Sequence, residues 1–335
     1  MSKSDINDDV PTWQSYLQLL RLPNIFTAMA DVAMGFFFVR PAWAWDTAHN
    51  RLLPGGVWVL ALLVASSSLL YAAGVVLNDL FDVEQDRIER PERPLPSGRI
   101  SLRAARWLGW EMLLAGFLLA GIVTRILWHA QPAAIGQFWI EIRPAAVAGL
   151  LALAIVLYDA VLKRTPLGPL AMGSCRMLNV LLGMSVSRAP WAAADWLVAA
   201  AIGVYVAGLT WFARDESGTS DRRKLAAATA VMAAGVILLG WLPKWTDQII
   251  PAISVQPNTW YLLIALLGGI IGARCLWAIA EPDPQRVRVA VGRAIISLVF
   301  LDAAACYATC GTYWAAMILL LLIPATLLGP WISST

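Results

Sequence analysis

The sequence predicts an all-α fold, a polytopic membrane protein whose helical bundle contains about nine to ten transmembrane helices. Two observations lead to this fold class. Hydrophobic residues make up 59% of the 335 residues and charged residues only 14%, whereas soluble domains average about 45–50% apolar and about 25% charged residues. The chain is also divided into apolar stretches of about 20 residues, the length that crosses a bilayer as a helix.

The predicted spans are separated by short polar or proline-containing connections. They cover residues 13–39, 57–78, 104–127, 144–162, 167–187, 193–213, 225–243, 259–279, 290–309 and 313–331. Pro324 and Pro330 interrupt the last stretch, so the sequence leaves open whether this tenth helix spans the membrane. Residues 1–12 are expected to form a polar cytosolic N-terminus and residues 13–335 a single transmembrane domain. The N-terminus lacks the pattern of a cleaved signal peptide.

Lys and Arg side chains favour one side of this arrangement. The connections on the side of the N-terminus and of segment 79–103 carry most of them, and the positive-inside rule makes that side cytoplasmic. We therefore expect a multi-pass protein of the cell membrane with a cytoplasmic N-terminus and cytoplasmic active-site loops. The net charge is only +3, and no nucleic-acid partner is expected.

Cysteine and histidine supply no site. The cysteines Cys175, Cys275, Cys306 and Cys310 lie in apolar runs without CxxC spacing and are expected to be buried thiols. His49 and His129 fall in segments placed on the far side of the membrane from segment 79–103. Histidine-centred catalysis is therefore excluded.

A group of oxygen-bearing side chains ends the second predicted span. Asn78, Asp79, Asp82 and Asp86 share one sector of a helix, and Glu84 points away from it. Such close carboxylates repel one another unless a divalent cation or an array of basic groups neutralises them. Because the ligands are all hard oxygens, the cation would be Mg²⁺, which commonly bridges carboxylates to substrate phosphates. The alternative is a capped, solvated helix end.

This motif carries a family resemblance. Residues 78–86 read NDLFDVEQD and residues 90–98 read RPERPLPSG, which is similar to the NDxxDxxxD and RPLPSG signature of the UbiA superfamily of intramembrane prenyltransferases. Arg21-Leu22-Pro23-Asn24 resembles the RxxN-type opening of that superfamily, and Tyr158 with Lys163-Arg164 resembles its YxxxxKR segment. The order of motifs fits over residues 13–309.

The resemblance implies a central cavity open to lipid and a Mg²⁺-dependent prenyltransferase. Its chemistry ionises a polyprenyl diphosphate and transfers the prenyl group to a small, often aromatic, acceptor, whose identity here is unknown. Carried over by position, the metal ligands are Asn78, Asp82 and Asp86, with Asp79 as a ligand or its support. The expected diphosphate contacts are Arg21, Asn24, Lys163, Arg164 and Arg176.

One expected motif is altered. Family members carry a second aspartate motif at the end of the sixth helix, where this chain reads TWFARDE at residues 210–216. Arg214 either holds phosphate directly in place of a second Mg²⁺, or Asp215 or Glu216 still reaches a metal from a loop. A surface network of charges at a helix end is the third interpretation. This segment and residues 172–179 resemble the EboC-like branch of the superfamily.

Other function classes remain for comparison. The altered motif is also compatible with a catalytically inactive relative that binds or transports an isoprenoid or lipid-like compound. A secondary transporter would show inverted repeats and paired broken helices, and a CDP-alcohol phosphotransferase would carry a DGxxAR core. Neither pattern is found in the sequence.

Overall fold

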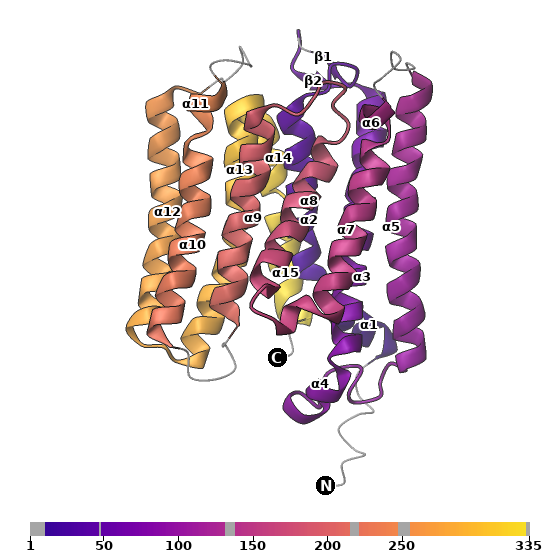
Figure 1. Cartoon of the computed structure of the whole chain (residues 1–335), viewed down its shortest axis with the longest axis vertical. Coiled ribbons are helices and arrows are strands. Elements are labelled where there is room, and N and C mark those ends of the chain that lie inside the picture. Colours follow the sequence, from indigo (N-terminus) through magenta and orange to yellow (C-terminus); the bar gives the residue numbers. More distant parts are fainter. Residues whose placement is uncertain (1–10, 47, 131–137, 215–220, 247–254, 333–335) are drawn as a thin grey trace.

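The computed structural model describes residues 11–46, 48–130, 138–214, 221–246 and 255–332 as a bundle of long helices (Figure 1). The long helices are α2 (Leu22–Val39), α3 (Pro54–Phe81), α5 (Leu102–Ala130), α7 (Arg143–Ala160), α8 (Gly168–Met184), α9 (Ala193–Ala213), α10 (Arg222–Gly240), α12 (Pro257–Ala280) and α13 (Pro284–Cys310). The short helices are α1 (Thr12–Leu20), α4 (Val83–Glu89), α6 (Phe138–Glu141), α11 (Leu242–Thr246), α14 (Thr312–Leu319) and α15 (Leu322–Ile332). A hairpin pairs β1 (Trp45–Asp46) antiparallel with β2 (Arg51–Leu52).

The predicted all-α membrane fold is confirmed. Within the described residues, eight helices are long and apolar enough to cross a membrane, namely all the long helices except α8. At 17 residues, α8 corresponds to the fifth predicted span but is shorter than the others. The tenth predicted span, 313–331, is divided between α14 and α15, so the count of nine to ten spans is not confirmed.

The first predicted span, 13–39, is two helices. Arg21 separates α1 from α2 and adopts a left-handed backbone conformation with φ 45° and ψ 49°. Pro23 favours a helix start here because it fits the first turn of a helix and disrupts a helix interior. The left-handed conformation costs a non-glycine residue about 1–2 kcal/mol. It turns the chain at the residue whose side chain reaches the acidic motif.

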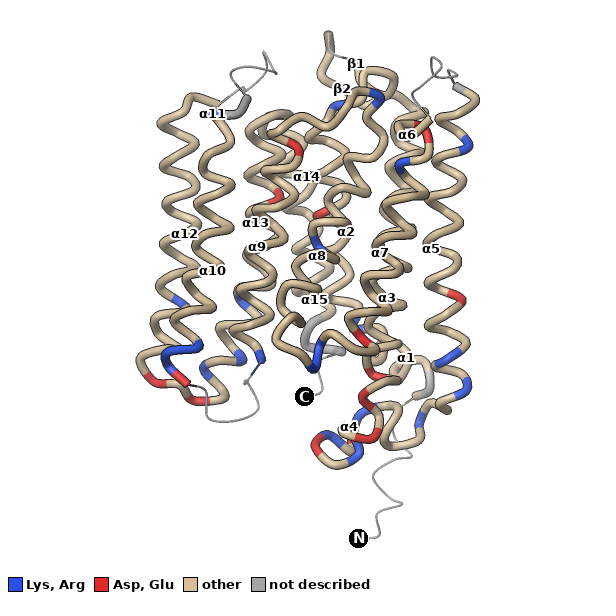
Figure 2. Tube along the Cα trace, in the orientation of Figure 1, with Lys and Arg blue, Asp and Glu red and all other residues tan. Residues whose placement is uncertain are grey.

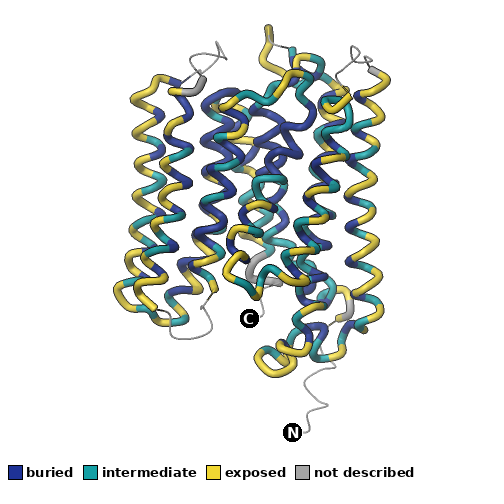
Figure 3. The backbone as a smooth tube through the Cα atoms, viewed as in Figure 1, coloured by how far each residue is buried: buried dark blue, intermediate teal, exposed yellow. Residues whose placement is uncertain are grey.

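Burial divides the bundle into central and outer helices (Figure 3). In α2 and α13, 67% of the spanning window is buried, against 28% in α5 and 22% in α12. The exposed faces of the outer helices carry large apolar side chains such as Leu118 and Leu262, as expected for helices that face lipid. The central helices pack closely: a Cβ at Gly183 of α8 would lie 2.1 Å from the Val32 carbonyl oxygen of α2.

Charged residues concentrate at one end of the bundle (Figure 2). We call the end that carries α4 and the loop 90–101 the acidic end, and the end that carries β1 and β2 the opposite end. The first and last described helices, α1 and α15, contact each other. Residues 1–10, which make up most of the predicted polar N-terminus, lie outside the described residues.

Candidate active site

A cavity of about 350 Å³ opens within the bundle, lined by α2, α3, α7, α8, α9 and α13. This volume lies within the range of small-molecule sites. Its wall is mainly apolar, with Leu151, Ile155, Leu209, Ile295 and Leu298 among the lining residues. Polar residues line it as well, and these are Arg21, Asn24, Ser67, Tyr71, Asn78, Tyr158, Asp159, Arg176, Asn179 and Thr210. The apolar wall suits a hydrocarbon chain.

The acidic motif continues from α3 into α4 on one face. The α3 helix ends at Phe81, and Asp82 joins it to α4. The backbone N–H of Asp82 donates to the Asn78 carbonyl at 3.0 Å, and that of Asp86 donates to the Asp82 carbonyl at 2.8 Å. The helical register is therefore kept. Glu84 has a side chain 78% exposed and pairs with Arg87, so it lies away from the motif, as predicted.

Two arginines hold the inner carboxylates. Asp79 and Asp86 are 6% and 5% exposed. The Arg21 guanidinium lies 2.6 Å from an Asp79 oxygen, and Arg93 Nη1 lies 2.8 Å from Asp86 and 3.7 Å from Asp79. From the sequence, the arginines just downstream of the motif were candidate phosphate contacts, but Arg93 was not singled out among them. The RPLPSG segment was the available signal, since its prolines turn the chain back over the helix end.

A third group of bases comes from the turn between α7 and α8, which contains a 3₁₀ helix (Leu162–Arg164). Lys163 Nζ lies 2.8 Å from Asp82 and 3.0 Å from the Asn78 side-chain oxygen. Arg164 lies 3.4 Å from Asp82, with 63% of its side chain exposed. The structure therefore brings Arg21, Lys163 and Arg164 to the acidic motif, and Asn24 lines the cavity beside Arg21.

The donor set at the acidic end fits Mg²⁺ in its chemistry. It consists of carboxylate and amide oxygens, which this cation prefers. In the part of the chain that the structure describes, no three His, Cys, Asp or Glu side chains converge on one point. Basic groups neutralise the carboxylates instead. Because Mg²⁺ is usually held through one or two carboxylates together with substrate phosphates, a convergent protein cage is not required.

Arg176 belongs to a deeper cluster. It lies about 12 Å along α8 from Gly168 and lines the cavity. Its guanidinium donates to Asp31 at 2.7 Å and to Thr27 at 2.8 Å, and it lies 5.2 Å from the Tyr71 ring centre. Asn179 also donates to Asp31, at 3.1 Å. These bonds join α2 to α8, so Arg176 has a structural role beside its predicted role as a diphosphate contact.

The altered second motif lies at the end of α9. Arg214 follows this helix directly, is exposed, and lies close enough to Tyr158 to interact with it electrostatically. Asp215 and Glu216, predicted as alternative metal ligands, lie outside the described residues. Asp221 accepts a hydrogen bond from the Arg223 backbone N–H at 2.8 Å and thereby begins α10.

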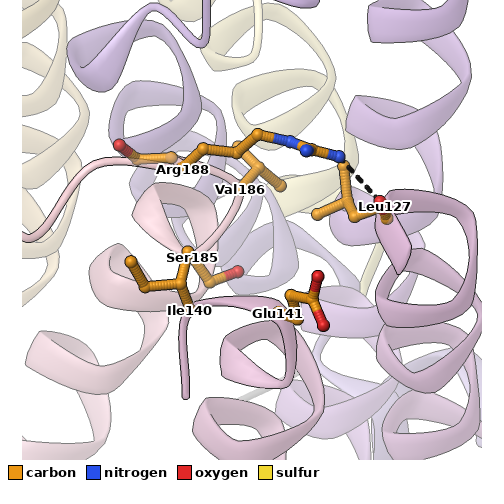
Figure 4. Close-up of a pocket in the computed structure, with 7 residues that line it drawn as sticks. Leu127, Ile140, Glu141, Ser185, Val186 and Arg188 are labelled. Carbon is orange, nitrogen blue, oxygen red and sulfur yellow. Dashed lines mark hydrogen bonds between the residues drawn. The ribbon is translucent and has the colours of Figure 1, made fainter. Parts of the chain in front are cut away.

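A second, much smaller pocket of about 40 Å³ lies between the ends of α5, α6 and α8 (Figure 4). It is lined by Leu127, Ile140, Glu141 and residues 185–188. Arg188 donates to the Leu127 carbonyl at 2.7 Å. Since one water needs about 10–15 Å³ by this measure, the pocket has room for a few waters and not for a substrate.

Comparison with known proteins identifies curated relatives over about a third to a half of the chain. A relative from Sulfurisphaera tokodaii named digeranylgeranylglyceryl phosphate synthase is 36% identical over 107 residues, which cover 32% of this chain and 34% of that protein. One of the same name from Methanopyrus kandleri is 31% identical over 53% of this chain and 56% of that protein. The chain therefore spans only about a third of the length of the first curated relatives it matches.

Solved structures share the fold. One described as digeranylgeranylglyceryl phosphate synthase in membranes has a TM-score of 0.60 and 22% identity, over 89% of this chain and 98% of that one. A UbiA homologue from Archaeoglobus fulgidus bound to GPP and Mg²⁺ has a TM-score of 0.55 and 17% identity, over 86% and 99%. The sequence profile of the UbiA prenyltransferase family matches residues 32–298. With four-fifths of its residues inside that match, this multi-pass membrane protein belongs to the UbiA prenyltransferase family.

Proposed function

We propose that the protein is a Mg²⁺-dependent prenyltransferase that moves a prenyl group from a polyprenyl diphosphate to a small acceptor within the membrane. The acidic end would face the cytosol, in accord with the charge bias of the sequence. One observation carries the proposal: the oxygen-bearing side chains of the acidic motif are joined to four basic side chains, and Arg21 and Asn78 of this group line the apolar cavity.

The diphosphate would bind among these bases. Arg21, Arg93, Lys163 and Arg164 now hold the motif carboxylates. When a diphosphate enters, the same nitrogens can donate to its oxygens, and arginine can do so through two parallel hydrogen bonds. Asn24 beside Arg21 would complete this edge, and Arg176 remains a predicted contact deeper in the cavity. Arg214 would add positive charge at the end of α9.

The motif carboxylates would turn from these bases to the cation. Asn78, Asp82 and Asp86 are the proposed ligands, Asp79 a further ligand or support, and Asp215 a ligand from the neighbouring segment. Bound there, Mg²⁺ would neutralise the charge that develops on the departing diphosphate. The apolar wall of α7, α9 and α13 would exclude water from the allylic carbon while the C–O bond breaks.

The acceptor is the least specified partner. The names of the curated relatives suggest an alkylated glyceryl phosphate, and the family resemblance suggests an aromatic ring. Either must reach the allylic carbon in the cavity, whose wall is mainly apolar. We therefore expect an amphiphilic acceptor that reaches the site from the bilayer.

The test is prenyl transfer by purified protein. Wild type is incubated with Mg²⁺, geranyl or geranylgeranyl diphosphate, and acceptors that include geranylgeranylglyceryl phosphate and substituted phenols, and products are identified by mass spectrometry. We expect product from wild type and a loss of at least about 100-fold in Asp82→Asn. The matched control is Asp46→Asn at the opposite end, whose side chain is 19% exposed against 22% for Asp82, and this variant should retain activity.

A second candidate function is a binding or transport protein without chemistry. The altered second motif favours it, because Arg214 stands at the end of α9, where the family carries an aspartate motif, and Asp221 caps α10. Mg²⁺-dependent binding of a thiolodiphosphate analogue without product from any acceptor would support this alternative. If the protein neither binds the analogue nor forms product, both functions are refuted.

A further inference from the structure

Asp159 differs from the other carboxylates around the cavity. It occupies the last turn of α7 and is 3% exposed. Among the described residues it is the one carboxylate that lines the cavity, and its Oδ2 has no hydrogen-bond partner. A buried polar atom without a partner is costly and calls for an explanation.

The carboxylates of the acidic motif have basic partners, and so has Asp31. Asp302 has no hydrogen-bond partner on either oxygen, but it does not line the cavity. Asp31 is bonded to Arg176 at 2.7 Å, Asp79 to Arg21 at 2.6 Å, Asp82 to Lys163 at 2.8 Å and Asp86 to Arg93 at 2.8 Å. Lys163 and Arg21 influence Asp159 only electrostatically, together with Asp79 and Asp82. Asp159 is therefore the carboxylate whose hydrogen-bonding capacity is left for a ligand.

Its position suits an acceptor more than a diphosphate. A phosphate oxygen presents no donor to a carboxylate and repels it, whereas a hydroxyl group donates to it. Asp159 also lies within electrostatic reach of Lys163 and Arg21, two of the bases that would hold the diphosphate, so a hydroxyl bound to it would share one end of the cavity with the diphosphate. Tyr158, adjacent in sequence, lines the same wall.

We propose that Asp159 hydrogen bonds a hydroxyl group of the acceptor and takes its proton during prenyl transfer. This inference rests on the proposed prenyltransferase function. The hydroxyl oxygen forms a bond to C1 of the prenyl group, and the C1–O bond breaks with its electron pair leaving on the diphosphate. The hydroxyl proton passes to Asp159 Oδ2, so that charge and atoms balance. The acceptor class is therefore a hydroxyl compound, and the product is an ether.

The test separates ionisation of the donor from transfer to the acceptor. Geranylgeranyl diphosphate labelled with ¹⁸O in the bridging position reports C–O bond cleavage by scrambling of the label. Transfer is measured with geranylgeranylglyceryl phosphate and with its methyl ether, which lacks the reacting hydroxyl. In Asp159→Asn we expect transfer to fall by about 100-fold or more, the contribution of a general base, while scrambling and Mg²⁺-dependent donor binding change less than about threefold.

The outcomes distinguish the two proposals. Wild-type transfer to the hydroxyl and none to the ether, with partial rescue in Asp159→Glu, supports the inference. Transfer by Asp159→Asn at the wild-type rate overturns it, as does loss of donor binding, which would make Asp159 a metal or phosphate ligand. Scrambling in wild type without transfer to the hydroxyl also overturns it but leaves the ionisation step intact. Absence of both scrambling and transfer refutes the proposed function itself.

Discussion

The pair formed by Arg176 and Asp31 yields a quantitative prediction. Asp31 is fully buried, and in Arg176→Met it would lose the guanidinium at 2.7 Å and keep the Asn179 amide and the buried Asp302 carboxyl as polar neighbours. Removing one partner of a buried ion pair costs about 3–5 kcal/mol, because it leaves an uncompensated charge. The lost contact with the Tyr71 ring adds about 0.5–1 kcal/mol.

The assay is reversible unfolding in mixed micelles, followed by tryptophan fluorescence. The exposed Arg125 of α5 provides the control, since Arg125→Met should change stability by less than about 0.5 kcal/mol. Asp31→Asn combined with Arg176→Met removes the stranded charge and should regain most of the loss.

Two results would refute the reasoning. One is a loss below about 1 kcal/mol in Arg176→Met, and the other is a double variant no more stable than the single one. If the Arg176→Met variant keeps its stability but loses Mg²⁺-dependent affinity for a prenyl thiolodiphosphate, Arg176 contacts the diphosphate and does not stabilise the packing of α2 against α8.

Three further outcomes are expected. Asp82→Asn should weaken binding of the thiolodiphosphate with Mg²⁺ at least about tenfold in calorimetry, and an unchanged affinity would contradict its role as a ligand. EDTA should abolish that binding yet leave the thermal midpoint of the ligand-free protein unchanged, because basic groups neutralise the carboxylates without metal; a lowered midpoint would indicate a resident structural cation. Gly183→Val should destabilise by at least about 1–3 kcal/mol, since its Cβ would meet the Val32 carbonyl, whereas Gly121→Ala, with no atom within 4 Å, should be tolerated in the same unfolding assay.

The helical segments could be predicted because crossing a bilayer imposes a length and an apolar composition on each of them. The residues at which these helices begin and end were harder to predict. The break at Arg21 divides a continuous apolar stretch through a backbone conformation that hydropathy does not encode. Pro324 indicated that residues 313–331 would not form one continuous helix. Whether α14 and α15 together cross the membrane depends on their packing against α2.

For the acidic motif, too, the sequence predicted one part of the arrangement and the structure supplied the rest. Its shared helix face follows from helical periodicity alone, and the hydrogen bonds across Asp82 preserve it. The sequence did not decide whether a metal ion or an array of basic side chains neutralises these carboxylates. The structure brings basic groups there from residues 21, 93 and 163, because the loop over the helix end and the α7–α8 turn fold onto the same end of the bundle.

The amino-acid sequence by itself determined that this chain is an all-helical membrane protein with a carboxylate-bearing helix end, since both depend on composition and on spacing along a single helix. Tertiary structure alone decided which acids are neutralised and which one is left facing the cavity. Asp159 and Asp31 both lie in apolar runs of the sequence. Asp31 forms an ion pair because Arg176 approaches it from another helix, whereas Oδ2 of Asp159 has no hydrogen-bond partner. Contacts between helices are set by packing, which neither hydropathy nor local periodicity encodes.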